Sequence, residues 1–114
     1  MQIEVKKWLY DIQSAIVEIE SYFNDYPKDF FIFQQNIMMK RAVERNLEII
    51  GEATNRILKI DNSIHISNAR NIVGLRNQII HAYDSIQDEI IWGIIVRNIP
   101  HLKQEIENIL ASNN

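Results

Sequence analysis

Arg76, Asn77 and His81 stand close together in the sequence and carry side chains that could act on a phosphate or a proton. Histidine titrates near neutral pH, so it can accept or donate a proton. Arginine stays charged and offers a planar fork to phosphate or carboxylate oxygens. On a helix, Asn77 and His81 are four residues apart and share a face with Gly74. This face is therefore polar and nearly bare.

Arg76 takes a different position on the same helix. With Ile72 as the reference it lies about 40° around the axis, beside the apolar stripe, where an unpaired guanidinium is costly. Glu48 and Glu52 are four residues apart and are natural partners for it. In this purely structural interpretation, Arg76 pairs with a carboxylate and His81 is an ordinary surface residue.

Apolar residues at steps of three and four predict helices around this segment. A first helix is expected over about residues 3–24, ended by the turn that contains Pro27. Asp29 can cap a second helical stretch, from Phe30 to Leu58, in which a bend near Gln34–Met38 is compatible with the pattern.

The second half of the chain continues this alternation. Lys59–Ser67 carries turn residues and is expected to be a loop, followed by a helix over about Asn68–Ala82. Ser85 and Asp88 fit a capping box that starts a further helix. Pro100 must kink or break that helix, and the residues after it form a last amphipathic helix. The predicted fold class is all-α, an up-and-down bundle of four to five helices.

The composition limits the classes of protein. The chain has 114 residues, with 46% hydrophobic and 24% charged residues, which is typical of one globular domain over residues 1–114. No cysteine is present, so disulfides and thiolate metal sites are excluded. His65 and His101 have no neighbours that suggest a ligand set, so we predict no metal site.

Charge and hydropathy bear on partners and location. The formal net charge of −3 argues against broad nucleic-acid binding but allows a small local basic site. No run approaches the roughly 20 apolar residues that a membrane helix needs. The N-terminus also lacks the apolar core of a signal peptide. We therefore expect a cytoplasmic protein with no membrane partner.

The segment Arg76-Asn-Gln-Ile-Ile-His81-Ala-Tyr83 resembles the R-x4-H-x-Y signature of HepT-like toxins in the HEPN superfamily. Gly74-Leu75, directly before the motif, is similar to the residues that precede it in the family. Upstream, Arg45–Ala53 is similar to the family's second long helix. Downstream, Ile91-Trp92 and Asn98–Leu102 match its closing helices in kind and spacing. The resemblance therefore covers nearly the whole chain.

This resemblance implies a toxin of a toxin–antitoxin pair, a metal-independent ribonuclease that needs no cofactor and works as a homodimer on RNA. It implies that His81 transfers protons, Arg76 stabilises phosphate and Asn77 orients phosphate or His81. Arg76 and His81 are about 140° apart on an ideal helix. They converge on one phosphate only if the arginine wraps around the helix or if the pair is completed across a dimer.

The resemblance also implies a nucleotidyltransferase antitoxin as partner, with Tyr83 as a candidate for AMP attachment. Such a modification would add charge and bulk beside the cleft. Equally, Tyr83 can be an amphipathic residue half-buried by the core. The sequence departs from the family in the 59–67 loop and in Asp84, which adds a negative charge next to Tyr83.

Two other functions remain open at this point. The chain can be a non-catalytic helical docking module that serves as the modification substrate of a nucleotidyltransferase. It can also be a nucleotide-binding sensor that uses the same cleft. Arg76, Asn77, His81 and Tyr83 together favour the ribonuclease, because a scaffold has no evident need for the histidine. The acidic balance and Asp84 favour the docking module.

Overall fold

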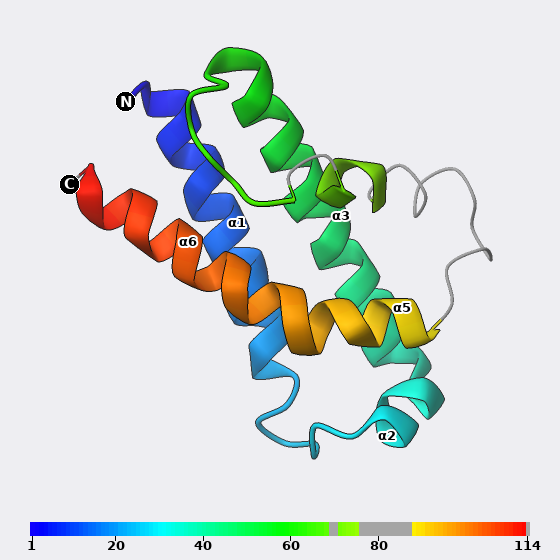
Figure 1. Cartoon of the computed structure of the whole chain (residues 1–114). Helices are drawn as coiled ribbons and strands as arrows, with labels where there is room; N and C mark the ends of the chain where they lie inside the picture. Colours follow the sequence, from blue (N-terminus) through cyan, green and yellow to red (C-terminus); the bar gives the residue numbers. More distant parts are fainter. Residues whose placement is uncertain (69–70, 76–87, 114) are drawn as a thin grey trace.

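The computed structural model describes residues 1–68, 71–75 and 88–113 (Figure 1). Within these ranges the chain is helical and contains no strand, so the predicted all-α fold is confirmed. A short helical stretch also covers residues 71–75. The other elements, in chain order, are α1 (Ile3–Ser21), α2 (Phe30–Gln35), α3 (Ile37–Ile60), α5 (Asp88–Gly93), the π-helical turn η1 (Ile94–Asn98) and α6 (Ile99–Ser112).

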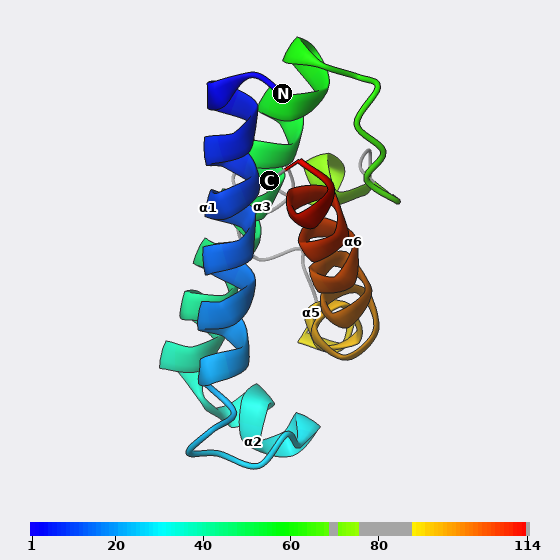
Figure 2. The same ribbon diagram turned by 90° about the vertical axis from the view of Figure 1, so that its left-hand side faces the viewer.

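The long helices α1 and α3 run antiparallel and side by side, and α6 packs across α1 (Figures 1 and 2). Both long helices bury the stripes that the apolar spacing predicts, because residues three and four apart lie on one helix face. The residues buried on α1 include Val5, Leu9, Ile12, Ile16 and Ile19, and those on α3 include Met39, Val43, Leu47, Ile50 and Ile57. None of the described helices is both long and apolar enough to cross a bilayer.

The bend in the second helical stretch occurs at Asn36, within the range that the sequence allowed. Asn36 has an extended backbone, and its side-chain oxygen accepts a hydrogen bond of 3.0 Å from the backbone N–H of Met39. It therefore ends α2 and caps α3. Asp29 caps α2 as predicted, because its carboxylate accepts from the N–H groups of Phe31 and Ile32.

Pro100 interrupts the regular α-helix without the chain leaving its helical path. A proline at this position cannot donate to the carbonyl four residues back. The turn before it is widened into η1, in which the N–H of Ile99 donates to the carbonyl of Ile94, five residues earlier. Ile91, Ile95 and Ile99, each four residues from the next, stay on the buried face through this wider turn.

The loop after α3 is tied to α6. Ile66 is buried in the core, and the backbone N–H and hydroxyl of Ser67 both donate to the carboxylate of Glu105. Asn68 follows with a φ of 60°, a conformation that asparagine tolerates better than most residues. The sequence did not show what the 59–67 loop contacts, and the structure shows that it contacts α6. These contacts position the stretch 71–75, which follows the loop.

Candidate functional site

The predicted site residues Arg76, Asn77, His81 and Tyr83 lie outside the described residues, and so does Ser85 of the predicted capping box. The structure does describe the chain on both sides of this segment. On one side the described residues reach Leu75, directly before Arg76, and on the other they resume at Asp88, the first residue of α5 and five residues after Tyr83.

The stretch 71–75, which precedes the motif, has an apolar face and an exposed face, as the sequence predicts. Ile72 and Leu75 are partly buried and pack against the core. Gly74 is exposed, and a Cβ built on it would meet no atom of the described residues within 4 Å. The backbone N–H of Ile72 donates to the carbonyl of Asn68 at 3.0 Å, which fixes the start of the stretch. The bare face predicted at Gly74 is therefore confirmed for this residue.

An ion pair holds the chain at Asp88, five residues after the motif. Asp88, the first residue of α5, forms an ion pair of 3.2 Å with Lys40 of α3, and both side chains are partly buried. Nearby, burial raises the pKa of Glu44 above its usual value, although the positive charges of Lys40 and Arg41 oppose this shift. The pair therefore holds the start of α5 against α3 in a partly desolvated, charged environment.

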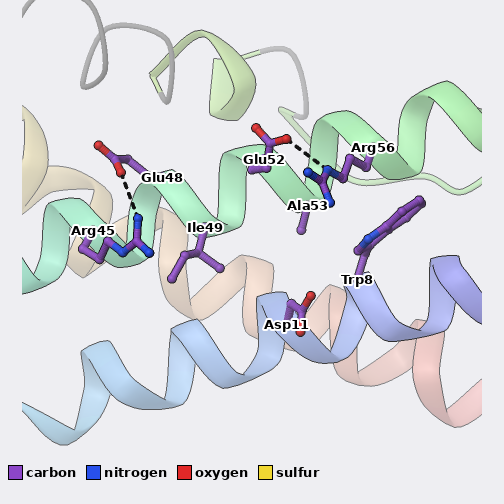
Figure 3. Close-up of a pocket in the computed structure, with 8 residues that line it drawn as sticks. All are labelled: Trp8, Asp11, Arg45, Glu48, Ile49, Glu52, Ala53 and Arg56. Carbon is purple, nitrogen blue, oxygen red and sulfur yellow. Dashed lines mark hydrogen bonds and ion pairs between the residues drawn. The ribbon is translucent and has the colours of Figure 1, made fainter.

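Glu48 and Glu52, the predicted partners of Arg76, project from α3 on the side away from α1 (Figure 3). Each has an arginine of its own helix nearby, at 3.7 Å between Arg45 Nη1 and Glu48 Oε2 and 3.0 Å between Arg56 Nε and Glu52 Oε1. Arg45 and Arg56 were not predicted as partners of these glutamates, although their spacings of three and four residues are typical of helical ion pairs. A contact between either glutamate and Arg76 remains a prediction.

These ion pairs border an open groove of about 330 Å³ between α1 and α3. Trp8 and Asp11 of α1 form its other wall (Figure 3). Surface ion pairs of this kind contribute about 0–1 kcal/mol, so they are weak stabilisers of the fold. Among the described residues that line the groove there is no histidine, so the groove is a charged surface feature without an imidazole.

The two described histidines, His65 and His101, are exposed. His65 lies in the loop after α3, and Nε2 of His101 is 3.8 Å from the carboxylate of Glu105. Across the three described ranges, no group of three or more His, Cys, Asp or Glu side chains could hold a metal ion.

Residues 12–109, which include the whole Arg76–Tyr83 motif, match the model of a family described as Ribonuclease HepT-like. This chain belongs to that family. The resemblance predicted from the motif is thereby confirmed, and with it the assignment to a ribonuclease family.

Individual relatives agree with this assignment. Two proteins of Methanocaldococcus jannaschii, each named a "Putative RNase", are 37% identical over 106 residues and 33% identical over 108 residues. The first alignment covers 91% of this chain and 94% of the relative, and the second covers 94% and 88%. The "Probable ribonuclease HepT" of Thermococcus cleftensis is 31% identical over 105 residues, covering 91% of this chain and 94% of that protein. No solved structure gives a significant match.

Proposed function

We propose that this HepT-like protein is a metal-independent endoribonuclease that acts as the toxin of a toxin–antitoxin pair. The observation that carries the proposal is that the family match includes Arg76, Asn77, His81 and Tyr83 together. An imidazole, a guanidinium and an amide supply what RNA cleavage without a metal requires: a group that moves protons and a cation that holds charge on phosphate.

The proposed reaction is attack by a ribose 2′-hydroxyl on the adjacent phosphorus. One His81 accepts the proton of the 2′-hydroxyl as the 2′-oxygen–phosphorus bond forms. A second imidazole donates a proton to the 5′-oxygen as the bond between that oxygen and phosphorus breaks. Arg76 holds the non-bridging oxygens of the phosphate, and Asn77 orients the phosphate or the imidazole. One subunit has one His81, so the reaction needs two subunits at one cleft.

Glu48 and Glu52 have a positioning role in this proposal. Both lie on α3, and both project away from the α1 side of that helix (Figure 3). Their carboxylates would hold the Arg76 guanidinium in the orientation that faces phosphate, in addition to their contacts with Arg45 and Arg56.

We predict a homodimer whose interface includes the polar face of the helix that contains Gly74. Light scattering at micromolar concentration should give twice the chain mass of 13.5 kDa. Gly74 allows a sharper test, because a Cβ at this exposed position would contact none of the described residues of its own chain. Gly74→Trp should shift the dimer towards monomer, whereas Asn62→Trp in the exposed loop should not. A wild-type monomer, or equal behaviour of both variants, would contradict this interface.

Cleavage of RNA should be unaffected by EDTA, because His81 and Arg76 carry out the reaction without a bound metal. The measurement compares the rates of cleavage of a labelled RNA with EDTA and with magnesium. A His81→Ala preparation purified in parallel reports contaminating nuclease. Activity that disappears with the chelator and returns with magnesium would overturn the mechanism.

The proposed partner is a nucleotidyltransferase antitoxin that attaches AMP to Tyr83. AMP at this position would place a negative phosphate and a bulky nucleoside beside the cleft and so exclude RNA. The second candidate function, a docking module for the same partner, is favoured by the acidic balance of the chain and by Asp84. The two functions differ in one measurable property, which is cleavage of RNA by the unmodified protein.

A further inference from the structure

A second cavity, of about 320 Å³, lies where the stretch 71–75 meets α3 and the helical run from η1 into α6. In Figures 1 and 2 this stretch is the short light-green helix near α3. The floor of the cavity is apolar and combines side chains from three separate parts of the chain, among them Leu47, Ile50, Ile72, Leu75, Ile99 and Leu102. Its volume is at the lower end of the roughly 300–1,000 Å³ of small-molecule sites, which suits a ligand of a single ring system.

Three asparagines line the rim of this apolar floor: Asn68, Asn71 and Asn98. All three are exposed, and within the described ranges none of their side-chain amides makes a hydrogen bond. Asn98 stands directly before α6, where asparagine often caps a helix, yet its side chain makes no capping bond. Each amide therefore keeps two donors and one acceptor for a ligand.

Two further polar groups at the rim, Ser67 and Glu105, are already bonded to each other, while His101 keeps an exposed imidazole. The Glu105 carboxylate accepts three hydrogen bonds from Ser67, one of them at 2.7 Å from the hydroxyl, and it also faces His101. No lysine or arginine is found among the described residues that line the cavity. Without a lysine or arginine among these residues, the site favours a neutral planar group with hydrogen-bonding edges over a phosphate.

We propose that this cavity binds one nucleobase of a single-stranded RNA substrate. Proteins read unpaired bases by apolar contact with the ring and by hydrogen bonds to its edges, and asparagine amides are well suited to the second task. Leu75 lines the cavity and is followed directly by Arg76, so a base held here would lie near the phosphate that Arg76 binds. This inference rests on the proposed ribonuclease function and adds to it a determinant of sequence preference.

The test uses binding of oligonucleotides that cannot be cleaved. Four 2′-O-methyl hexanucleotides, each of one base and labelled with fluorescein, are titrated with the full-length protein and followed by fluorescence anisotropy. The four nucleoside monophosphates form a second arm, as competitors. The variants are Asn71→Ala and Asn98→Ala, which remove exposed amides without known internal bonds, and the matched control is Asn62→Ala in the exposed loop.

Wild type and Asn62→Ala should prefer one hexanucleotide. Asn71→Ala and Asn98→Ala should each lose about 5- to 150-fold in affinity for it, the factor that corresponds to a base-specific pair of hydrogen bonds. Equal binding of all four hexanucleotides by wild type, or a preference unchanged in both variants, overturns the proposal. Monophosphates that compete as well as the hexanucleotide, with the same dependence on the asparagines, support a nucleobase site whose ligand is a free nucleotide.

The outcome can be separated from that of the proposed function. If the protein cleaves RNA but shows no base preference that depends on Asn71 or Asn98, the base site is wrong and the ribonuclease stands. If the preference is present and depends on these residues while no RNA is cleaved, the base site stands and the catalytic proposal is wrong. Melting curves of each variant, compared with wild type, identify any loss of affinity that comes from unfolding.

Discussion

Replacing His81 with alanine is expected to reduce RNA cleavage at least about 100-fold while the helical fold is retained. A positioned acid or base contributes about 10²- to 10⁴-fold to a rate, and both proton transfers in the proposed reaction use this imidazole. The predicted position of His81 is on the polar face of its helix, so its loss should change stability by no more than about 0.5 kcal/mol. The rate is measured on a labelled RNA, with circular dichroism and a melting curve for each protein.

The matched control is His65→Ala. His65 is an exposed histidine in the loop after α3, so this variant changes the same residue type outside the proposed cleft. Its cleavage rate should equal that of wild type. Arg76→Ala should also abolish cleavage, but the predicted pairing with Glu48 or Glu52 means that it could also lower the stability of the fold. His81→Ala is therefore the clearer of the two tests.

Each other outcome has a definite meaning. A folded His81→Ala protein that cleaves RNA at the wild-type rate excludes catalysis by this imidazole, and the preparation must then be checked for contaminating nuclease. If neither wild type nor variant cleaves RNA while a nucleotidyltransferase modifies Tyr83, the docking module is the correct function. Loss of cleavage in His65→Ala as well would point to a general effect on the fold.

The helical framework was predictable because its signals are local and repeated. The stripes on α1 and α3 each involve five or more buried residues at steps of three and four, and few other structures fit such a pattern. The cap at Asp29 was also visible, since a short acidic side chain before an apolar run is a common helix start. The break at Asn36 was harder to place, because residues on both of its sides favour helices.

The consequence of Pro100 depended on geometry that the sequence does not contain. A proline in a helix can produce a kink, a break or a wider turn, and the choice depends on which carbonyl the neighbouring N–H groups reach. Here the backbone N–H of Ile99 donates a hydrogen bond to the carbonyl of Ile94, and the helical path continues. The sequence predicted that the regular helix is interrupted, but it could not select this form of interruption.

The candidate site was predictable only in part. The motif from Arg76 to Tyr83 was found through a family resemblance, since an arginine and a histidine five residues apart are weak signals alone. The asparagine-rimmed cavity was missed because its members come from segments up to 58 residues apart in the sequence, as Leu47 and Glu105 are. Asparagine is also common in loops and helix caps, so its presence in a sequence does not indicate a binding site. Only the structure shows that these amides make no hydrogen bond within the described residues.

Phe33→Ala is expected to destabilise the fold by about 3–5 kcal/mol, the usual cost of removing a fully buried phenylalanine. Phe33 has no exposed surface, and its ring centroid is 5.3 Å from that of Trp92 on α5. The six-residue helix α2 is too short to be stable alone, so its place in the fold depends on this contact. The melting temperature should fall by more than about 10 °C, since each kcal/mol shifts it by several degrees in a domain of this size.

Phe31→Ala provides a control within the same helix. Phe31 lies two residues away and is 70% exposed, so the same substitution there removes little buried surface and should change stability by about 0.5 kcal/mol or less. Any gain in helix propensity from alanine is common to both variants and cancels in the comparison. Both melting curves are recorded at one protein concentration, because a dimer melts at a temperature that depends on concentration. Equal melting temperatures for the two variants would show that α2 is not held in place by Phe33.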